Sequence, residues 1–271
     1  MNKQKKLTRR NFLGLSGAAA ILGGITCIGG VSGYLVLDYL TSSDPTDPQS
    51  LTPIPTTGPK SDSSRPTTLK QIDRPAIVLR ADWGALEPNH EAKWEPGFYS
   101  LTNVDGWREY EGDLRAIYNT VVVHHSVLYE TDDYSTMREI QTEHMDTREW
   151  ADVGYHFGVG KTGVVFEGRD LMARGTHVQS FNYGTVGVVL FGNFEEENPS
   201  QEQIESARRL IDWLALRLEL THLAGHRDFN EGTDCPGDNL YYYLEALAES
   251  AGLIHSTDGY TPPPEAPTPE P

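Results

Sequence analysis

The chain has 271 residues and a formal net charge of −17, with 22 Lys and Arg against 39 Asp and Glu. This balance excludes binding to nucleic acid, because contacts to phosphates need a basic surface. It also argues against electrostatic capture by an anionic wall or lipid surface, so attachment to either must come from a specific site or an anchor. With only two cysteines, the chain is not a disulfide scaffold.

The N-terminal residues have the basic-then-apolar order of an export signal. Residues 1–11 read MNKQKKLTRRN, and no charged side chain occurs from Phe12 to Leu37. The run TRRNFLG resembles the twin-arginine signal of bacterial Tat export, which a receptor reads. The apolar stretch is long enough to cross about 30 Å of hydrocarbon as a helix. We therefore predict that residues 1–40 are a Tat-type signal that remains as a membrane anchor, with cleavage and release as the alternative.

Polar, proline-rich segments flank one globular block. Residues 41–76 are rich in Ser, Thr, Pro and Asp, and residues 254–271 end in TPPPEAPTPEP. Both segments have too few apolar side chains to offset the entropy of ordering, which is typical of a disordered linker and a disordered tail. Residues 77–253 are therefore expected to form one folded domain, acting as a monomer.

The sequence of the first half of this domain predicts a strand, a helix and a hairpin. Thr120–His125 is a β-branched run typical of a buried strand. Thr136 and Glu139 can form a capping box for a helix that ends near Met145. Residues 155–159 and 164–166 flank the turn Lys161-Thr162-Gly163, a pattern that indicates a β-hairpin.

The sequence of the second half predicts one more strand and two helices. Val186–Phe191 is typical of a buried strand, and Ser200 with Gln203 can cap a helix that ends near Leu218. A last helix is expected over residues 240–248. This mixture indicates an α/β fold with a single mixed β-sheet covered by helices.

Candidate metal ligands lie where these strands end. His124 and His125 close the first strand, and His226 closes the segment THLAGH. Open α/β sheets place ligands at such strand ends, and turns downstream of His226 could return Cys235 to the same side. Two imidazoles and a thiolate are a known ligand set of catalytic zinc. Adjacent strand side chains point to opposite faces, so strand geometry allows either His124 or His125, but not both, to reach one metal.

Other residues have simpler interpretations. His144, near the end of a helix, and His156, on a hairpin strand, are expected to be structural. Cys235 has no disulfide partner in an exported domain, which leaves a buried inert thiol, a catalytic nucleophile or a metal ligand.

Five motifs in one order resemble a known family. They are RADWGA at 80–85, VVVHHS at 121–126, DVGYHFGVG at 152–160, GTHVQSFNYGTVGVVLFGNF at 175–194 and GHRDFNEGTDCPG at 225–237. Together they are similar to the type 2 N-acetylmuramoyl-L-alanine amidases, a family that includes the peptidoglycan recognition proteins. The resemblance covers about residues 78–250. It implies a zinc amidase-like fold and a zinc-dependent hydrolase that cleaves the amide between N-acetylmuramic acid and L-alanine in peptidoglycan.

The resemblance also implies roles for single residues. One zinc ion would be held by His124, His226 and Cys235. Tyr155 and Thr233 would donate hydrogen bonds to the oxyanion that develops during the reaction. His177 and Asn182 would lie along the groove that binds muropeptides.

Two departures from the family pattern affect specificity. Asp170-Leu171 follows Gly168-Arg169, where many recognition proteins have Gly-Trp, so a preference for one third residue of the stem peptide does not transfer. Residues 88–114 form a longer segment than is usual, with several aromatic side chains, and are interpreted as a lid or a groove wall.

Two other functions stay open at this point. Cys235 could act as the nucleophile of a wall peptidase with His226 as its base, and zinc content separates that enzyme from the amidase. A non-catalytic peptidoglycan-binding module is the other alternative, although such relatives lack the cysteine. The expected partners are peptidoglycan and the Tat machinery, and the expected location is outside the cytoplasm, anchored in the membrane and facing the cell wall.

Overall fold

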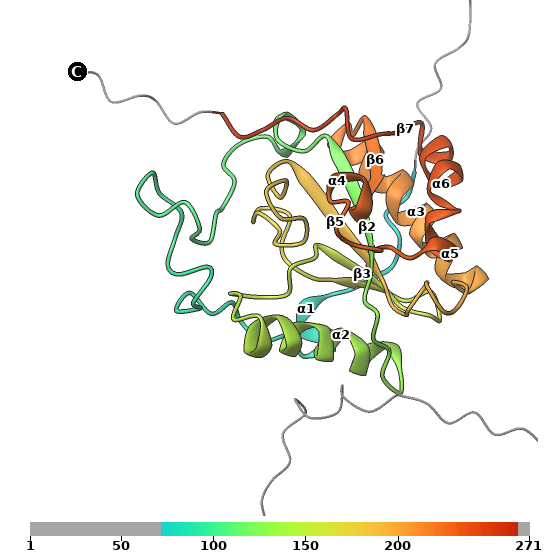
Figure 1. Ribbon diagram of the computed structural model, residues 1–271, viewed down its shortest axis with the longest axis horizontal. Coiled ribbons are helices and arrows are strands. Elements are labelled where there is room, and N and C mark those ends of the chain that lie inside the picture. Colours follow the sequence, from blue (N-terminus) through green and yellow to red (C-terminus); the bar gives the residue numbers. More distant parts are fainter. Residues whose placement is uncertain (1–71, 265–271) are drawn as a thin grey trace, which may run out of the picture. The chain divides into compact units, whose positions relative to one another are not determined.

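The computed structural model describes residues 72–264 (Figure 1). The predicted signal and nearly all of the predicted linker lie outside the described residues, as do residues 265–271. Within residues 72–264, no helix combines the length and apolar character that a membrane span needs.

Seven strands form one sheet, in the order β1-β4-β3-β5-β2-β6-β7. Their bounds are β1 Ile77–Val78, β2 Thr120–His125, β3 Phe157–Val159, β4 Val165–Glu167, β5 Thr185–Leu190, β6 His222–Gly225 and β7 Ile254–His255. β3 and β4 pair antiparallel, as the predicted hairpin requires, and all other neighbours pair parallel. The predicted single mixed sheet is confirmed.

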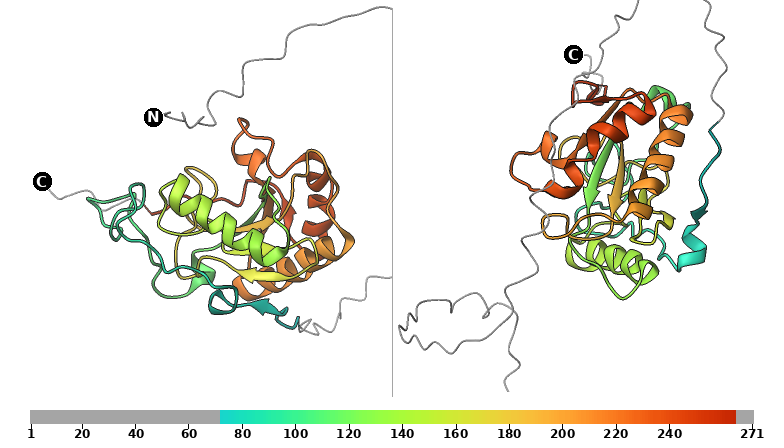
Figure 2. Two further views of the ribbon diagram at one scale, coloured as in Figure 1. Left: turned by 90° about the horizontal axis from the view of Figure 1, so that it is seen from below. Right: turned by 90° about the vertical axis from the view of Figure 1, so that its right-hand side faces the viewer.

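Helices cover both faces of this sheet. Their bounds are α1 Arg80–Trp83, α2 Asp133–Thr142, α3 Gln201–Leu218, α4 His226–Phe229, α5 Asp238–Tyr241 and α6 Leu244–Ala251. A 3-10 turn spans Leu114–Ala116, and a π-helical turn, Glu143–Thr147, continues α2. α2 packs on one face of the sheet, while α3 and α6 lie side by side on the other (Figures 1 and 2).

The alternation of side chains along β2 decides which face receives each histidine. Val121 and Val123 pack in the core under α3 and α6. His125 has the same parity and points to that side, where its Nδ1 accepts a hydrogen bond from Phe194 N at 3.3 Å. His124 therefore points to the face that carries α2.

The helix starts show which capping predictions were right. The predicted capping box at Thr136 is wrong: α2 is capped four residues earlier by Asp132, whose carboxylate accepts from Ser135 N at 2.9 Å. For α3, Ser200 Oγ accepts from Gln203 N at 3.0 Å as predicted. The Gln203 amide does not return to the cap; it donates to Val159 O and Phe191 O, which ties α3 to the sheet.

The C-terminal end extends further than the sequence suggests. The pattern predicts a disordered tail from residue 254, but Ile254–His255 pairs with β6 as β7. Tyr260 then packs against Phe181 and Phe229, with ring centroids 5.1 and 6.0 Å apart. The predicted last helix is present as two pieces, α5 and α6.

Candidate active site

His124, His226 and Cys235 come together where β2 and β6 end. Their candidate ligand atoms all lie within 4.8 Å of one another, and Cys235 Sγ is 3.6 Å from His124 Nδ1. The loop after α4 returns Cys235 to this place, because Arg227 N donates to Cys235 O at 2.8 Å. The turn predicted at Pro236-Gly237 is present, with Gly237 at φ 90° and its N–H bonded to Asp234 O.

The donor set fits a zinc ion. Zinc takes nitrogen and sulfur ligands at about 2.0–2.3 Å in a tetrahedron, which spaces the ligand atoms about 3.5 Å apart. The distance between Cys235 Sγ and His124 Nδ1 matches this spacing. Burial lowers the pKa of His124, with the nearby His177 and His226 rings adding to the effect, and burial lowers the pKa of His226. Both imidazoles are therefore neutral at pH 7 and can offer a lone pair.

Cys235 is poorly suited to act as a free nucleophile. Its side chain is 8% exposed, and burial raises the pKa of the thiol to about 12. A nucleophilic cysteine needs a lowered pKa, whereas a bound metal displaces the thiol proton directly. The environment of Cys235 favours a metal ligand over the nucleophile of a cysteine peptidase.

His177 makes a contact that the sequence did not predict. Its Nδ1 lies 3.0 Å from His124 Nε2, and its own Nε2 lies 3.4 Å from Thr185 O. The ring fits there because a Cβ at Gly187 would lie 2.6 Å from His177 Cδ2. Protons on both Nε2 atoms satisfy both contacts, which leaves the Nδ1 lone pair of His124 facing Cys235.

Asn182 holds the loop that carries His177. Its Oδ1 accepts hydrogen bonds from His177 N and Val178 N, each at 2.8 Å. These two bonds fix the amide orientation, and the side chain also lines the groove. Asn182 is therefore a loop-stabilising residue at the edge of the site.

Tyr155 and Thr233 both lie beside the ligand cluster. The Tyr155 ring centroid is 5.0 Å from that of His124, and burial raises the pKa of Tyr155, so its hydroxyl is a protonated donor. Thr233 Oγ1 accepts from Cys235 N at 3.2 Å, which leaves its own proton available. Both side chains line the groove.

His144 is a buried structural residue, as predicted, but the segment that it holds was not predicted. It is 5% exposed, and its Nδ1 accepts from Gly154 N at 2.9 Å. Its ring lies 5.3 Å from that of Tyr155 and lines the same groove. His144 therefore positions the segment that carries Tyr155, a contact across ten residues that no periodic pattern reveals.

These residues line a groove of about 1220 Å³. One wall comes from residues 88–114, through Trp94, Asp105 and Arg108, so this segment is a wall of the groove. The C-terminal segment reaches the rim with Tyr260 and Pro263. The volume suits an extended ligand of several residues or sugars.

Comparison with known proteins identifies the family. A family model described as N-acetylmuramoyl-L-alanine amidase matches residues 114–238, a range that contains all seven predicted site residues. Peptidoglycan-recognition protein LB of Drosophila melanogaster is 30% identical over 191 residues, which cover 68% of this chain and 73% of that protein. This chain belongs to the N-acetylmuramoyl-L-alanine amidase and peptidoglycan-recognition protein family.

Further relatives of this family agree with the assignment. An N-acetylmuramoyl-L-alanine amidase of Sus scrofa is 40% identical over 114 residues, which cover 41% of this chain and 19% of that enzyme. The solved structure of Drosophila PGRP-LB gives a TM-score of 0.52 at 28% identity, with 68% of this chain and 98% of that chain covered. A mutant of the same protein was solved in complex with tracheal cytotoxin.

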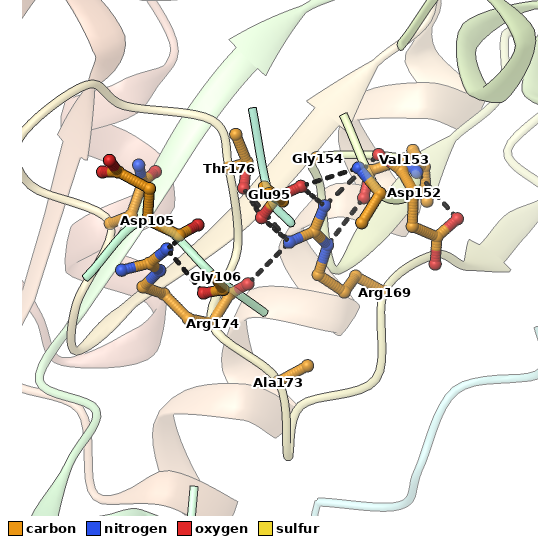
Figure 3. A network of polar contacts seen from close by, with 12 residues as sticks. Glu95, Asp105, Gly106, Asp152, Val153, Gly154, Arg169, Ala173, Arg174 and Thr176 are labelled. Carbon is orange, nitrogen blue, oxygen red and sulfur yellow. Dashed lines mark hydrogen bonds and ion pairs between the residues drawn. The ribbon is translucent and has the colours of Figure 1, made fainter. Parts of the chain in front are cut away.

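A buried ion pair fixes the groove wall formed by residues 88–114 to the rest of the domain. The Glu95 carboxylate receives two hydrogen bonds from Arg169, at 2.8 and 2.9 Å, and further ones from Thr176 Oγ1 and Ala151 N (Figure 3). Glu95 and Arg169 are 3% and 1% exposed, and Arg169 lies 4.5 Å from the Trp107 ring centroid. Burial alone raises the pKa of Glu95, but the charge and hydrogen bonds of Arg169 outweigh it, and the pKa lies below 4.5.

Replacing Glu95 by Gln is expected to destabilise the domain by about 3 kcal/mol or more, because Arg169 keeps a buried charge without its partner. For a domain of this size, the Tm should fall by about 6–12 °C. The pKa of Glu95 is lower in the folded protein than the unfolded value of 4.5, so the ionised carboxylate contributes to the free energy of unfolding above pH 4.5. This contribution is lost as the pH falls through the folded pKa. The Tm difference between wild type and variant should therefore narrow below about pH 4.5.

The control is Glu149→Gln, which breaks an exposed pair between the same wall and the domain. Lys93 Nζ and Glu149 Oε2 lie 2.7 Å apart, but both side chains are about half exposed, so the loss should stay below about 1 kcal/mol. Equal thermal shifts in the two variants would contradict a structural role for the Glu95–Arg169 pair.

Proposed function

We propose that this chain is a zinc-dependent hydrolase that cleaves the amide between N-acetylmuramic acid and L-alanine in bacterial peptidoglycan. The observation that carries the proposal is the convergence of His124, His226 and Cys235 in a groove, with Tyr155 beside them. The family includes both amidases and recognition proteins. Retention of a complete donor set, including the cysteine, favours the catalytic function over a binding module.

The chain's own residues would bind and orient the substrate. A zinc ion held by His124, His226 and Cys235 would, when bound, activate water and polarise a carbonyl oxygen. The hydroxyls of Tyr155 and Thr233 would donate hydrogen bonds to the carbonyl oxygen as negative charge develops on it. Each donor is held in advance, Tyr155 through the contact of His144 with Gly154 and Thr233 through the amide of Cys235.

Digestion of purified cell wall tests the proposal. We expect release of stem peptides with a free amino group on L-alanine and of glycan strands that keep the lactyl group, identified by mass. Cleavage between stem-peptide residues would instead support a wall peptidase. Tight binding without any released fragment would support the binding module.

His177 is expected to contribute to zinc affinity through His124. A histidine ligand whose second nitrogen is hydrogen-bonded keeps its tautomer and orientation, and losing that partner typically lowers metal affinity about 10- to 100-fold. We expect His177→Ala to weaken zinc binding by this factor, measured by competition with a chelating dye. His177→Gln, whose amide oxygen can accept from His124 Nε2, should restore part of the loss. Unchanged affinity in His177→Ala would show that His177 only borders the groove.

We also propose Tat export and attachment to the membrane through residues 1–40, which lie outside the described residues. Replacing Arg9 and Arg10 by Lys should leave the protein in the cytoplasm, because the receptor reads the arginine pair and not the charge alone. Cell fractionation measures this, with the Lys5→Arg, Lys6→Arg variant as the control. Unchanged export after the Arg9 and Arg10 changes would indicate another route, and a mature chain that begins within residues 41–76 would show cleavage.

A further inference from the structure

The C-terminal segment forms a strap, residues 256–264, that reaches the rim of the groove (Figure 1). It continues from β7, the edge strand that pairs with β6. Gly259 then passes against His222 so closely that a Cβ at Gly259 would clash with the His222 ring. The strap follows residues 114–238, which the family model matches, so it lies outside that part of the fold.

Tyr260 of the strap completes an aromatic cluster at this rim. Its ring centroid lies 5.1 Å from that of Phe181 and 6.0 Å from that of Phe229, and the two phenylalanine centroids are 5.0 Å apart. The Tyr260 hydroxyl also donates to Ser180 O, at a long 3.4 Å. Within residues 72–264, none of the three rings belongs to the buried core clusters. Phe181, Phe229 and Tyr260 therefore form a separate group, called here the rim cluster.

Each phenylalanine of the rim cluster belongs to a segment that carries a histidine of the site. Phe229 is the last residue of α4, the single helical turn that begins at His226. Phe181 lies four residues after His177, in the same loop. Both histidines contact His124, with ring centroids 5.0 Å from it for His177 and 4.7 Å for His226. The rim cluster therefore joins the two segments that place these histidines against His124.

The helix α4 depends on such contacts for its order. A single turn is unstable in isolation, because nucleating a helix fixes several backbone dihedrals for one hydrogen bond. The Asp228 carboxylate accepts from Gly225 N at 2.7 Å and supports the start of α4, while Phe229 supports its end through the rim cluster. A segment with few tertiary contacts opens locally at low free energy. When only a fraction of the molecules is competent to bind a ligand, the affinity falls by that fraction.

We propose that Tyr260 is a positioning residue of the metal site, whose ring packs against Phe181 and Phe229 and so keeps His177 and His226 in the arrangement that binds zinc. The inference rests on the proposed function, because zinc is the ion that this arrangement would hold. Tyr260 also lines the groove, so direct contact with the substrate is the competing role. That role predicts a change in KM with the zinc affinity unaltered.

Hydrogen–deuterium exchange of the full chain, freed of metal, tests the contact itself. We expect Tyr260→Ala to make the amide hydrogens of residues 178–182 and 226–231 exchange about tenfold faster, because two ring contacts are lost. Tyr260→Phe keeps the ring and loses only the long hydrogen bond, so it should exchange like the wild type. Tyr242→Ala is the matched control, because Tyr242 is 82% exposed at the end of α5.

Competition with a chelating dye measures the zinc affinity of the same variants. We expect Tyr260→Ala to bind zinc about 3- to 10-fold more weakly, with no change in Tyr260→Phe or Tyr242→Ala. Phe181, unlike Tyr260, is not one of the described residues that line the groove, so Phe181→Ala alters the rim cluster alone. It should reproduce the loss, and it replaces Tyr260→Ala if that variant does not fold. The double variant should lose less than the product of the two single losses, because both changes remove one shared contact.

Three results would overturn the proposal. The first is unchanged exchange and unchanged zinc affinity in Tyr260→Ala. The second is a higher KM for a muramoyl tripeptide with exchange and zinc affinity like the wild type, which assigns Tyr260 to substrate contact. The third is an equal increase of exchange along the whole described chain, which shows a general loss of stability. If the wild type binds no zinc or hydrolyses no muramoyl peptide, the proposed function fails, and exchange in the metal-free chain still decides whether Tyr260 orders α4.

Discussion

Replacing His124, His226 or Cys235 by Ala is expected to reduce hydrolysis of muramoyl peptides below detection and to remove the bound zinc. Three protein ligands are the minimum set of a catalytic zinc site, so the loss of one leaves too few. The three candidate ligand atoms lie within 4.8 Å of one another and come from two strand ends and one loop. Metal analysis of each purified variant, with turnover measured on the same sample, gives the result.

His125→Ala is the matched control, because it removes the neighbouring imidazole. His125 points to the opposite face of the sheet and accepts from Phe194 N, so this variant should keep its zinc. Loss of zinc in His125→Ala with retention in His124→Ala would show that the other neighbour is the ligand. Wild-type protein without zinc, in a preparation never exposed to chelator, would contradict the metal site itself.

Tyr155→Phe is expected to lower turnover by a factor of about 10² to 10³ while zinc stays bound. A preorganised donor to an oxyanion contributes about 2.7–4 kcal/mol, because water does not replace it without reorganising. Burial raises the pKa of the Tyr155 hydroxyl, so it remains a donor across the neutral range. The loss should fall on kcat more than on KM, since the charge that it meets exists only in the transition state.

Kinetics on a defined muramoyl peptide separate this role from simple packing. Tyr155 contacts the rings of His124 and His144, and Phe preserves those contacts. A packing residue would therefore tolerate the change with nearly normal turnover. A decrease of less than about threefold would remove Tyr155 from the catalytic set.

Local patterns predicted the elements that bring the metal ligands together. The β-branched run of β2 and the Ser200 cap of α3 are visible in short windows, so both elements were predicted within a residue. The strand-end rule and the Pro-Gly turn were enough to suggest that Cys235 returns to His226. The error at the start of α2 has a local cause, since Asp132 and Thr136 are both good capping residues and only the structure shows which of them bonds the free N–H groups.

Contacts between distant segments could not be predicted in the same way. His177 lies 53 positions from His124, and their hydrogen bond depends on the space left by Gly187 on another strand. Glu95 lies 74 positions from Arg169, in a segment without periodic apolar residues, so nothing local decided between the predicted lid and the predicted groove wall. Strand geometry left the choice between His124 and His125 open, and only the resemblance made it. The structure supplies the physical reason, because Val121 and Val123, and with them His125, face α3 and α6.

Hydrolysis of a defined N-acetylmuramoyl tripeptide, followed by mass and by the appearance of a free L-alanine amino group, tests the central claim most directly. The protein is measured as isolated, after removal of metal by a chelator, and after zinc is returned. We expect cleavage only at the bond between the lactyl group and L-alanine, loss of activity after chelation and recovery with zinc. Cleavage that persists in metal-free protein, or cleavage at any other bond, would contradict the account.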